Sequence, residues 1–205
     1  MNKNEALIVV DVQNDFLEGG ALGVSKASEI IAGINQILPL FEPVVFTQDW
    51  HPADHISFAV NHSGMKEYQT IETSYGPQIL WPQHCVQNSF GSEISSELNV
   101  GTSFIQRKGM HRDIDSYSAF LEADRKTKTG LDEVLKSKGV SKVYVCGLAT
   151  DFCVSWSAID AKEMGFDVVV LEDLCRGLDI EGSIEKEKEK WRSLGIEILN
   201  SNVLK

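Results

Sequence analysis

Residues 143–154 read Val-Tyr-Val-Cys-Gly-Leu-Ala-Thr-Asp-Phe-Cys-Val. The first part is an apolar, β-branched run typical of a buried strand. The pattern breaks at Gly147 and becomes helical after Asp151, so a sharp strand-to-helix turn places Cys153 at or next to the first turn of a helix. Free N–H groups and the helix dipole favour negative charge there, which lowers the pKa of a thiol and can hold an oxyanion. The stretch leaves two interpretations of Cys153 open, a nucleophile and a buried structural cysteine.

The rest of the chain alternates between strand and helix patterns around this stretch. Because strands that alternate with helices form right-handed crossovers, the pattern predicts an α/β fold with a parallel, doubly wound sheet. Glycine follows three of the helices, as expected of left-handed caps. The predicted strands are 6–10, 44–48, 102–106, 143–146, 168–171 and 196–199, and the predicted helices are 30–38, 131–138, 152–164 and 184–194.

Length and charge restrict the class of protein. The 205 residues show no repeat or linker, and we expect one domain over 1–205. A net charge of −11 argues against nucleic acid and anionic membranes as partners, and a homo-oligomer is compatible with the sequence. No apolar run is long enough to span a bilayer.

The cysteines and the N-terminal residues indicate the compartment. The four cysteines show no paired spacing, and the first residues lack the pattern of a secretory signal. We therefore expect reduced thiols and a cytoplasmic protein.

Three reactive side chains follow different predicted strands. Asp11 comes after the first strand, Lys108 after the third, and Cys153 after the fourth. Because parallel strands place their carboxyl ends at one edge, the three can meet as base, cation and thiol. The alternative is a loop-capping Asp11, a surface Lys108 and a packed Cys153, and spacing alone does not exclude it.

A second group of residues has the chemistry of metal ligands. Asp49 and His51 lie two residues apart at a strand end, so both side chains point to the same side. With His84 they offer two imidazoles and one carboxylate, a set suited to Zn²⁺, Fe²⁺ or Mn²⁺ with open positions. His55 is a further possible ligand, whereas His62 and His111 are interpreted as ordinary loop histidines. The loop-rich stretch 52–100 that contains most of them is long enough to be functional.

The motifs at these positions resemble those of the nicotinamidase/pyrazinamidase group of the isochorismatase-like cysteine hydrolases. The resemblance covers nearly the whole chain and rests on several motifs in the same order. They are Val-Asp-Val-Gln-Asn-Asp-Phe from Val10, Asp-Trp-His-Pro from Asp49, Trp-Pro-Gln-His-Cys-Val from Trp81, Lys108-Gly109, Asp-Ser-Tyr-Ser-Ala-Phe from Asp115, Gly-Leu-Ala-Thr-Asp-Phe-Cys-Val from Gly147, and Cys-Arg-Gly from Cys175.

The resemblance implies a three-layer α/β/α fold with a six-stranded, mainly parallel sheet. It implies Cys153 as nucleophile, Asp11 as general base and acid, and Lys108 as the cation that supports both. A cis peptide is implied between Leu148 and Ala149, with the N–H groups of Ala149 and Cys153 as the oxyanion hole.

The resemblance also assigns the ligands of the metal and the substrate. Asp49, His51 and His84 match the ligands of one divalent ion, with Zn²⁺ ahead of Fe²⁺ and Mn²⁺, whereas His55 aligns with a ligand of only some members. The substrate contacts that it implies are Phe16, Trp81, Tyr117, Leu148 and Ala149.

The implied activity is metal-assisted hydrolysis of nicotinamide to nicotinate and ammonia through a thioester, in NAD salvage, with pyrazinamide as a further substrate. The alternative within the superfamily is a cysteine amidohydrolase of carbamoyl or ureido substrates, which the metal ligands disfavour. An alternative of another class is a non-catalytic metal-binding or thiol redox module, in which Asp11 and Lys108 are incidental. The segment Met110 to Ile114 looks particular to this chain, and the loop at 61–78 is long. Both bear on access to the pocket and therefore on substrate breadth.

Overall fold

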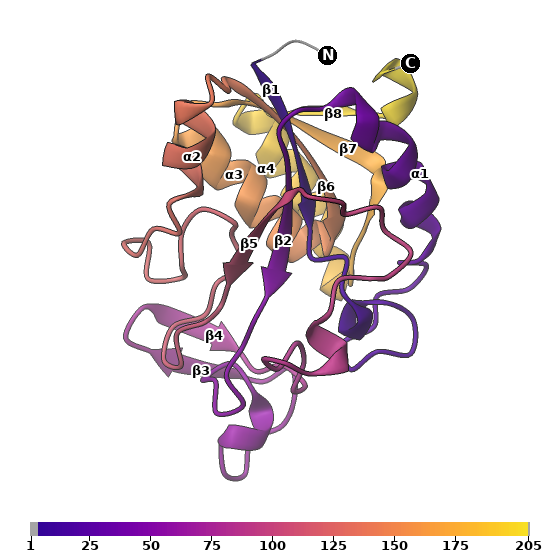
Figure 1. Cartoon of the computed structure of the whole chain (residues 1–205). Helices are drawn as coiled ribbons and strands as arrows, with labels where there is room; N and C mark the ends of the chain where they lie inside the picture. The colour runs from indigo at the N-terminus through magenta and orange to yellow at the C-terminus, as the bar shows by residue number, and fades with distance from the viewer. Residues whose placement is uncertain (1–3, 205) are drawn as a thin grey trace.

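The computed structural model describes residues 4–204, and its centre is a parallel β-sheet. Six strands lie in the order β5-β2-β1-β6-β7-β8, and every neighbouring pair is parallel (Figure 1). The apolar runs of β1 and β6 are buried along their length, as expected of central strands covered on both faces. The strands are β1 Glu5–Val10, β2 Val44–Asp49, β5 Phe104–Lys108, β6 Lys142–Leu148, β7 Asp167–Arg176 and β8 Glu197–Leu199.

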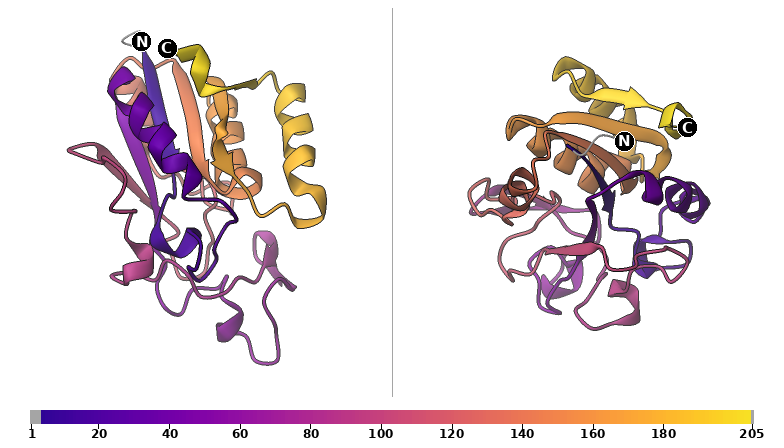
Figure 2. Two further views of the ribbon diagram at one scale, coloured as in Figure 1. Left: turned by 90° about the vertical axis from the view of Figure 1, so that its right-hand side faces the viewer. Right: turned by 45° about the horizontal axis from the view of Figure 1, so that its top comes forward.

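Helices cover both faces of this sheet. In Figure 2, α1 lies on one face and α3 and α4 lie on the other, with α2 beside α3 in Figure 1. The isoleucines of α1 point into the core, and Gly139, Gly165 and Gly195 adopt the left-handed conformation just after α2, α3 and α4. The predicted three-layer α/β/α fold is confirmed. The helices are α1 Glu29–Ile37, α2 Leu131–Ser137, α3 Ser155–Glu163 and α4 Ser183–Ser193.

Some predicted boundaries were wrong. The third strand is 104–108 instead of 102–106, because it pairs with β2 up to Asp49 and Lys108 while Gly101 makes a turn before it. The helix predicted from 152 begins as a π-helical turn, Thr150–Val154, that leads into α3.

The loop-rich stretch 52–100 covers the carboxyl ends of the strands. It contains an antiparallel hairpin, β3 Thr70–Thr73 and β4 Gly76–Ile79, which the sequence did not predict. Figure 1 shows this hairpin beyond the arrowheads of β2 and β5. Since the carboxyl ends of the central strands meet here, this edge is where the candidate residues gather.

Among residues 4–204, no helix combines the length and the apolarity that crossing a bilayer would require.

Candidate active site and metal centre

Four neighbouring strands deliver the reactive side chains. Asp11 directly follows β1, Asp49 and Lys108 are the last residues of β2 and β5, and Cys153 lies in the π-helical turn after β6. All four residues are buried, with at most 6% of their surface exposed. The sheet order β5-β2-β1-β6 therefore brings together residues up to 142 positions apart in the sequence, as from Asp11 to Cys153.

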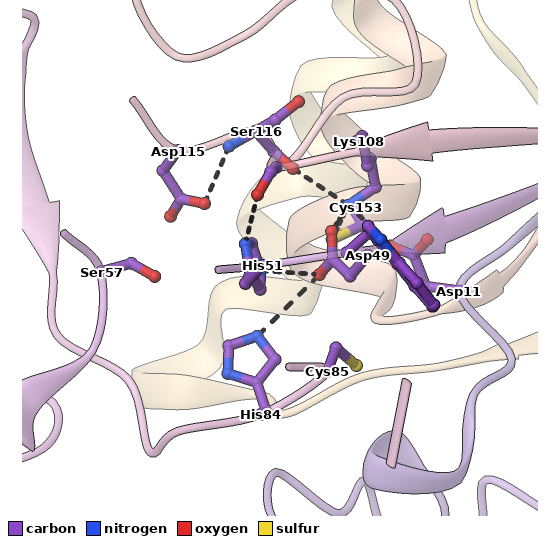
Figure 3. Close-up of polar contacts among 12 residues, drawn as sticks. Asp11, Asp49, His51, Ser57, His84, Cys85, Lys108, Asp115, Ser116 and Cys153 are labelled. Atoms are coloured by element: carbon purple, nitrogen blue, oxygen red, sulfur yellow. Dashed lines mark hydrogen bonds and ion pairs between the residues drawn. The ribbon is translucent and has the colours of Figure 1, made fainter. Parts of the chain in front are cut away.

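Lys108 is the centre of the group. Its Nζ lies 2.8 Å from Asp11 Oδ2 and 2.5 Å from Asp49 Oδ1. It also donates to the backbone oxygen of Ser116 at 3.0 Å and lies 3.4 Å from Cys153 Sγ. The ammonium thus links the predicted base, the predicted nucleophile and a predicted metal ligand (Figure 3).

Asp11 is held by β2 and keeps one oxygen available. Its backbone lies in the left-handed region, with φ of 47°, which is uncommon for a residue other than glycine. Thr47 Oγ1 donates to Asp11 Oδ1 at 2.5 Å and accepts from the Asp11 N–H at 3.1 Å. Within residues 4–204 no group donates a well-aligned hydrogen bond to Asp11 Oδ2, although Lys108 is close. This oxygen can therefore accept a proton.

Charge and burial determine the protonation of the three groups. Burial alone would lower the pKa of Lys108, but Asp11 and Asp49 raise it well above its ordinary value, so the ammonium stays charged. Burial raises the pKa of Asp11, and Lys108 only partly offsets this effect. The carboxyl of Asp11 therefore binds a proton more readily than an exposed aspartate does.

The prediction that the pKa of Cys153 is lowered was wrong. Burial raises the pKa of its thiol well above the ordinary value, and Asp11 raises it further, while Lys108 acts in the opposite direction. Before substrate binds, Cys153 is thus a thiol in an anionic surrounding. A nucleophilic role then requires a proton acceptor at the moment of attack.

Asp49, His51 and His84 form a compact group that could bind a metal ion. Their donor atoms lie within 4.8 Å of one another, and the Nε2 atoms of His51 and His84 are 3.5 and 3.9 Å from Asp49 Oδ2. Figure 3 shows both rings turned toward this carboxylate. Each Nδ1 faces a backbone carbonyl oxygen, that of Gly109 for His51 and that of Pro82 for His84. In the neutral imidazole Nδ1 therefore carries the proton, and the lone pair of Nε2 is available to a metal ion.

The electrostatics of the set suit a cation. Burial would raise the pKa of Asp49, but Lys108 and His51 lower it far below its ordinary value, so the carboxylate stays ionised. Burial and His51 lower the pKa of His84 to about 4, which leaves its imidazole neutral. One carboxylate and two imidazoles, with room for further ligands, fit a divalent ion of the zinc, iron or manganese type.

The remaining histidines have other partners. Nδ1 of His55 accepts from the Ser57 N–H at 3.3 Å and lies 2.7 Å from Ser57 Oγ, while its Nε2 faces the carbonyl oxygen of Ile114 at 3.3 Å. It belongs to a second group of possible ligands, with His51 and Asp115, and is outside the Asp49 group. His62 and His111 bond to Ile56 and Glu122, in keeping with loop roles.

A cavity of about 400 Å³, counted with its open mouth, lies over Cys153 and the metal ligands. Four aromatic side chains line it, those of Phe16, Trp81, Tyr117 and Phe152. Trp81 Nε1 donates to Tyr117 Oη at 2.9 Å, which holds these two rings in place. The Leu148–Ala149 peptide is cis, as predicted, and Ala149 lies on the wall. The lining residues are Phe16, Leu22, Val24, Asp49, His51, Trp81, His84, Asp115, Tyr117, Ala149, Phe152, Cys153 and Leu178.

Comparison with known proteins agrees with this arrangement. The isochorismatase domain model matches residues 5–201. The chain is 50% identical to a nicotinamidase of Acinetobacter baylyi over 203 residues, which span 98% of this chain and 95% of that protein. The chain belongs to the isochorismatase family.

Solved structures of nicotinamidases and pyrazinamidases have the same fold as this chain. A nicotinamidase/pyrazinamidase of Acinetobacter baumanii matches with a TM-score of 0.98 at 50% identity, and the match covers 100% of both chains. A pyrazinamidase of Pyrococcus horikoshii in complex with zinc matches with a TM-score of 0.79 at 37% identity, covering 96% of this chain and 99% of that one.

Against this isochorismatase-family fold, the sequence analysis located most of the cavity but not all of it. Phe16, Trp81, Tyr117 and Ala149 line it, whereas the described lining does not include Leu148, whose side chain is buried in the core. The contribution of Leu148 to the site is therefore the cis peptide bond that joins it to Ala149, and its side chain takes no part.

Five lining residues were not predicted. Phe152 and Asp115 lie inside quoted motifs, next to Cys153 and near Tyr117, so their positions gave a signal. The other three lie in loops where no local pattern points to a cavity; they are Leu22, Val24 and Leu178.

Proposed function

We propose that this protein is a nicotinamidase that hydrolyses nicotinamide to nicotinate and ammonia. The observation that carries the proposal is the contact of one buried ammonium, Lys108, with Asp11, Asp49 and Cys153. It connects the proposed base, Asp11, with the proposed nucleophile and a proposed metal ligand, Cys153 and Asp49, which both line one cavity. The high identity to a nicotinamidase of Acinetobacter baylyi supports the choice of substrate.

The cavity suits a small planar amide. Phe16, Trp81 and Tyr117 offer aromatic surface to a pyridine ring, and Asp49, His51 and His84 line the same cavity as Cys153. A divalent ion held by these three ligands would supply a Lewis-acid site for the ring nitrogen. We propose Zn²⁺ for this ion, with Fe²⁺ and Mn²⁺ as alternatives, and the zinc complex of the Pyrococcus pyrazinamidase supports the choice.

In the proposed reaction Cys153 Sγ attacks the amide carbon while its proton passes to Asp11 Oδ2. The N–H groups of Ala149 and Cys153 hold the oxyanion, and the proton on Asp11 goes to the leaving nitrogen as the C–N bond breaks. Ammonia leaves, and a nicotinoyl thioester stays on Cys153. Asp11 then takes one proton from water, whose oxygen attacks the thioester, and this proton returns to the sulfur as the C–S bond breaks. Nicotinic acid leaves with the second proton of the water and releases it to solvent, which gives nicotinate. Lys108 stays charged throughout and stabilises the ionised form of Asp11.

The test is ammonia release from nicotinamide, pyrazinamide and a carbamoyl amine by the metal-loaded protein. We expect turnover of the two ring amides and none of the carbamoyl amine. Cys153→Ala should lower kcat by at least about 10³-fold and leave metal content unchanged. Substantial turnover by Cys153→Ala would contradict the nucleophile, and a preference for the carbamoyl amine would contradict the substrate.

The proposal extends to the setting of the enzyme. All four cysteines lie in the described part of the chain and are unpaired, which supports a reducing, cytoplasmic location. We propose a single domain over 1–205, because the proposed active site takes residues from four adjacent strands of one sheet, β5, β2, β1 and β6. Assembly into a homo-oligomer stays a prediction, and size-exclusion chromatography tests it.

A further inference from the structure

Strand β1 stops pairing with β2 before β2 reaches the active site. The register of the two strands ends at Val9 and Phe46, whereas β2 continues to pair with β5 as far as Asp49 and Lys108. Beyond Val10 the backbone of the first strand turns away at Asp11, where φ becomes positive. The backbone groups of Asp49 on this side would therefore have lost their partner strand.

The side chain of Gln13 occupies the place of that partner. Its Oε1 accepts the Asp49 N–H at 2.8 Å, and its Nε2 donates to the Asp49 carbonyl at 2.8 Å. The second hydrogen of Nε2 goes to the carbonyl of Ser92 at 2.9 Å, and Gln13 has no exposed surface. One primary amide thus reproduces both hydrogen bonds that a neighbouring strand would give to Asp49.

The position of the Asp49 backbone matters because its two carboxylate oxygens have different partners. Oδ1 contacts Lys108, while Oδ2 faces the Nε2 atoms of His51 and His84. A shift or rotation of this residue would disturb the ammonium and the metal ligands together. On the other side β5 already holds β2 in place, since the Trp50 N–H donates to the Lys108 carbonyl at 3.0 Å.

We propose that Gln13 is a positioning residue for the metal centre: its amide replaces the missing strand and holds Asp49 so that one carboxylate serves both Lys108 and the metal. This inference rests on the proposed function, because it takes Asp49, His51 and His84 as metal ligands. Gln13 itself contacts neither metal nor substrate in this arrangement.

The matched control is Gln48. Its Nε2 donates to the same Ser92 carbonyl at 2.8 Å, and its Oε1 accepts from Arg107, but neither atom bonds to Asp49. Gln48→Ala therefore removes an amide that donates to the same Ser92 carbonyl, but it leaves both hydrogen bonds between Gln13 and Asp49 in place.

The experiment loads wild type, Gln13→Ala and Gln48→Ala with Zn²⁺ and measures the loss of zinc to a chromogenic chelator. We expect the zinc dissociation constant of Gln13→Ala to rise about 10- to 100-fold, and that of Gln48→Ala to stay within about threefold of wild type. Gln13→Glu, which keeps the acceptor but loses both donors, should not restore binding. Circular dichroism checks that each variant is folded, and Gln13→Asn, which keeps the amide but is too short to reach, replaces Gln13→Ala if that variant does not fold.

Two negative results have different meanings. If folded Gln13→Ala binds zinc as tightly as wild type, or Gln48→Ala loses as much affinity, the positioning role is wrong. If wild type binds zinc no better than His51→Ala, the proposed metal centre itself fails.

Discussion

In the proposed mechanism, the chemistry of the site depends on Lys108. An ammonium has three hydrogens, yet four acceptors surround this one: Asp11, Asp49, Cys153 and the carbonyl of Ser116. Two of these acceptors are carboxylates that are buried with it. The single ammonium therefore lies between two buried carboxyl groups and at the same time faces the sulfur of Cys153.

Lys108→Met should destabilise the protein and abolish turnover. Removing the ammonium leaves Asp11 and Asp49 buried without their cation, and breaking such a group costs about 3–5 kcal/mol. Urea unfolding of the metal-free protein measures this loss, and ammonia release measures activity. Lys142→Met is the control, since its 3.4 Å pair with Glu197 lies at the surface and is worth at most about 1 kcal/mol. Equal losses for the two variants would contradict the role of Lys108.

At the scale of elements, the segment between β7 and α4 forms part of the cavity through one buried carboxylate. Asp151, in the π-helical turn, accepts from the N–H groups of Leu178 and Asp179 at 3.0 and 2.9 Å and from Ser183 Oγ at 2.5 Å. Gly177 lies so close that a Cβ there would meet Asp151 Oδ1 at 2.6 Å. The turn that carries Cys153 thereby also fixes Leu178, which lines the cavity.

Asp151→Asn should weaken nicotinamide binding, because an amide cannot accept all three of these hydrogen bonds. We expect kcat/KM to fall roughly 10- to 100-fold, chiefly through KM. In a double-mutant cycle with Leu178→Ala, the two effects should be much less than additive if Asp151 acts by holding Leu178.

The control for this prediction is Asp173→Asn. Asp173 makes the same kind of contacts, with the N–H and Oγ of Ser201, but in an exposed position. The Asp173→Asn variant should leave KM for nicotinamide unchanged. Additive losses in the cycle would show that Asp151 affects the site by another route.

At the scale of the whole molecule, buried histidines in the site make the folded protein less stable as the pH falls. Burial and the neighbouring His51 lower the pKa of His55 to about 4, from an ordinary value of 6.5, and His84 behaves alike. The unfolded chain binds these protons below about pH 6.5, while the folded chain does not until about pH 4. Stability therefore falls as the pH drops through this window, and His51, whose pKa is raised by Asp49 against the effect of burial, partly offsets the loss.

His55→Asn should make the metal-free protein less sensitive to acid. Between pH 7 and pH 5 its loss of unfolding free energy should be smaller than that of wild type by at most about 2 kcal/mol. Urea unfolding at both pH values measures the difference, whatever the absolute stability of the variant. Identical pH dependence would mean that His55 is protonated equally in the folded and unfolded chains.

The sequence by itself determined the fold class, the reactive residue types and the edge of the sheet at which they gather. Apolar runs that alternate with helix patterns leave few arrangements, and parallel strands place their carboxyl ends together. Only the tertiary structure decided the sharing of Lys108 between Asp11 and Asp49, the raised pKa of Cys153, the hairpin at β3 and β4, and the replacement of a strand by Gln13. These features depend on burial and on contacts between segments distant in sequence, and local sequence patterns predict neither.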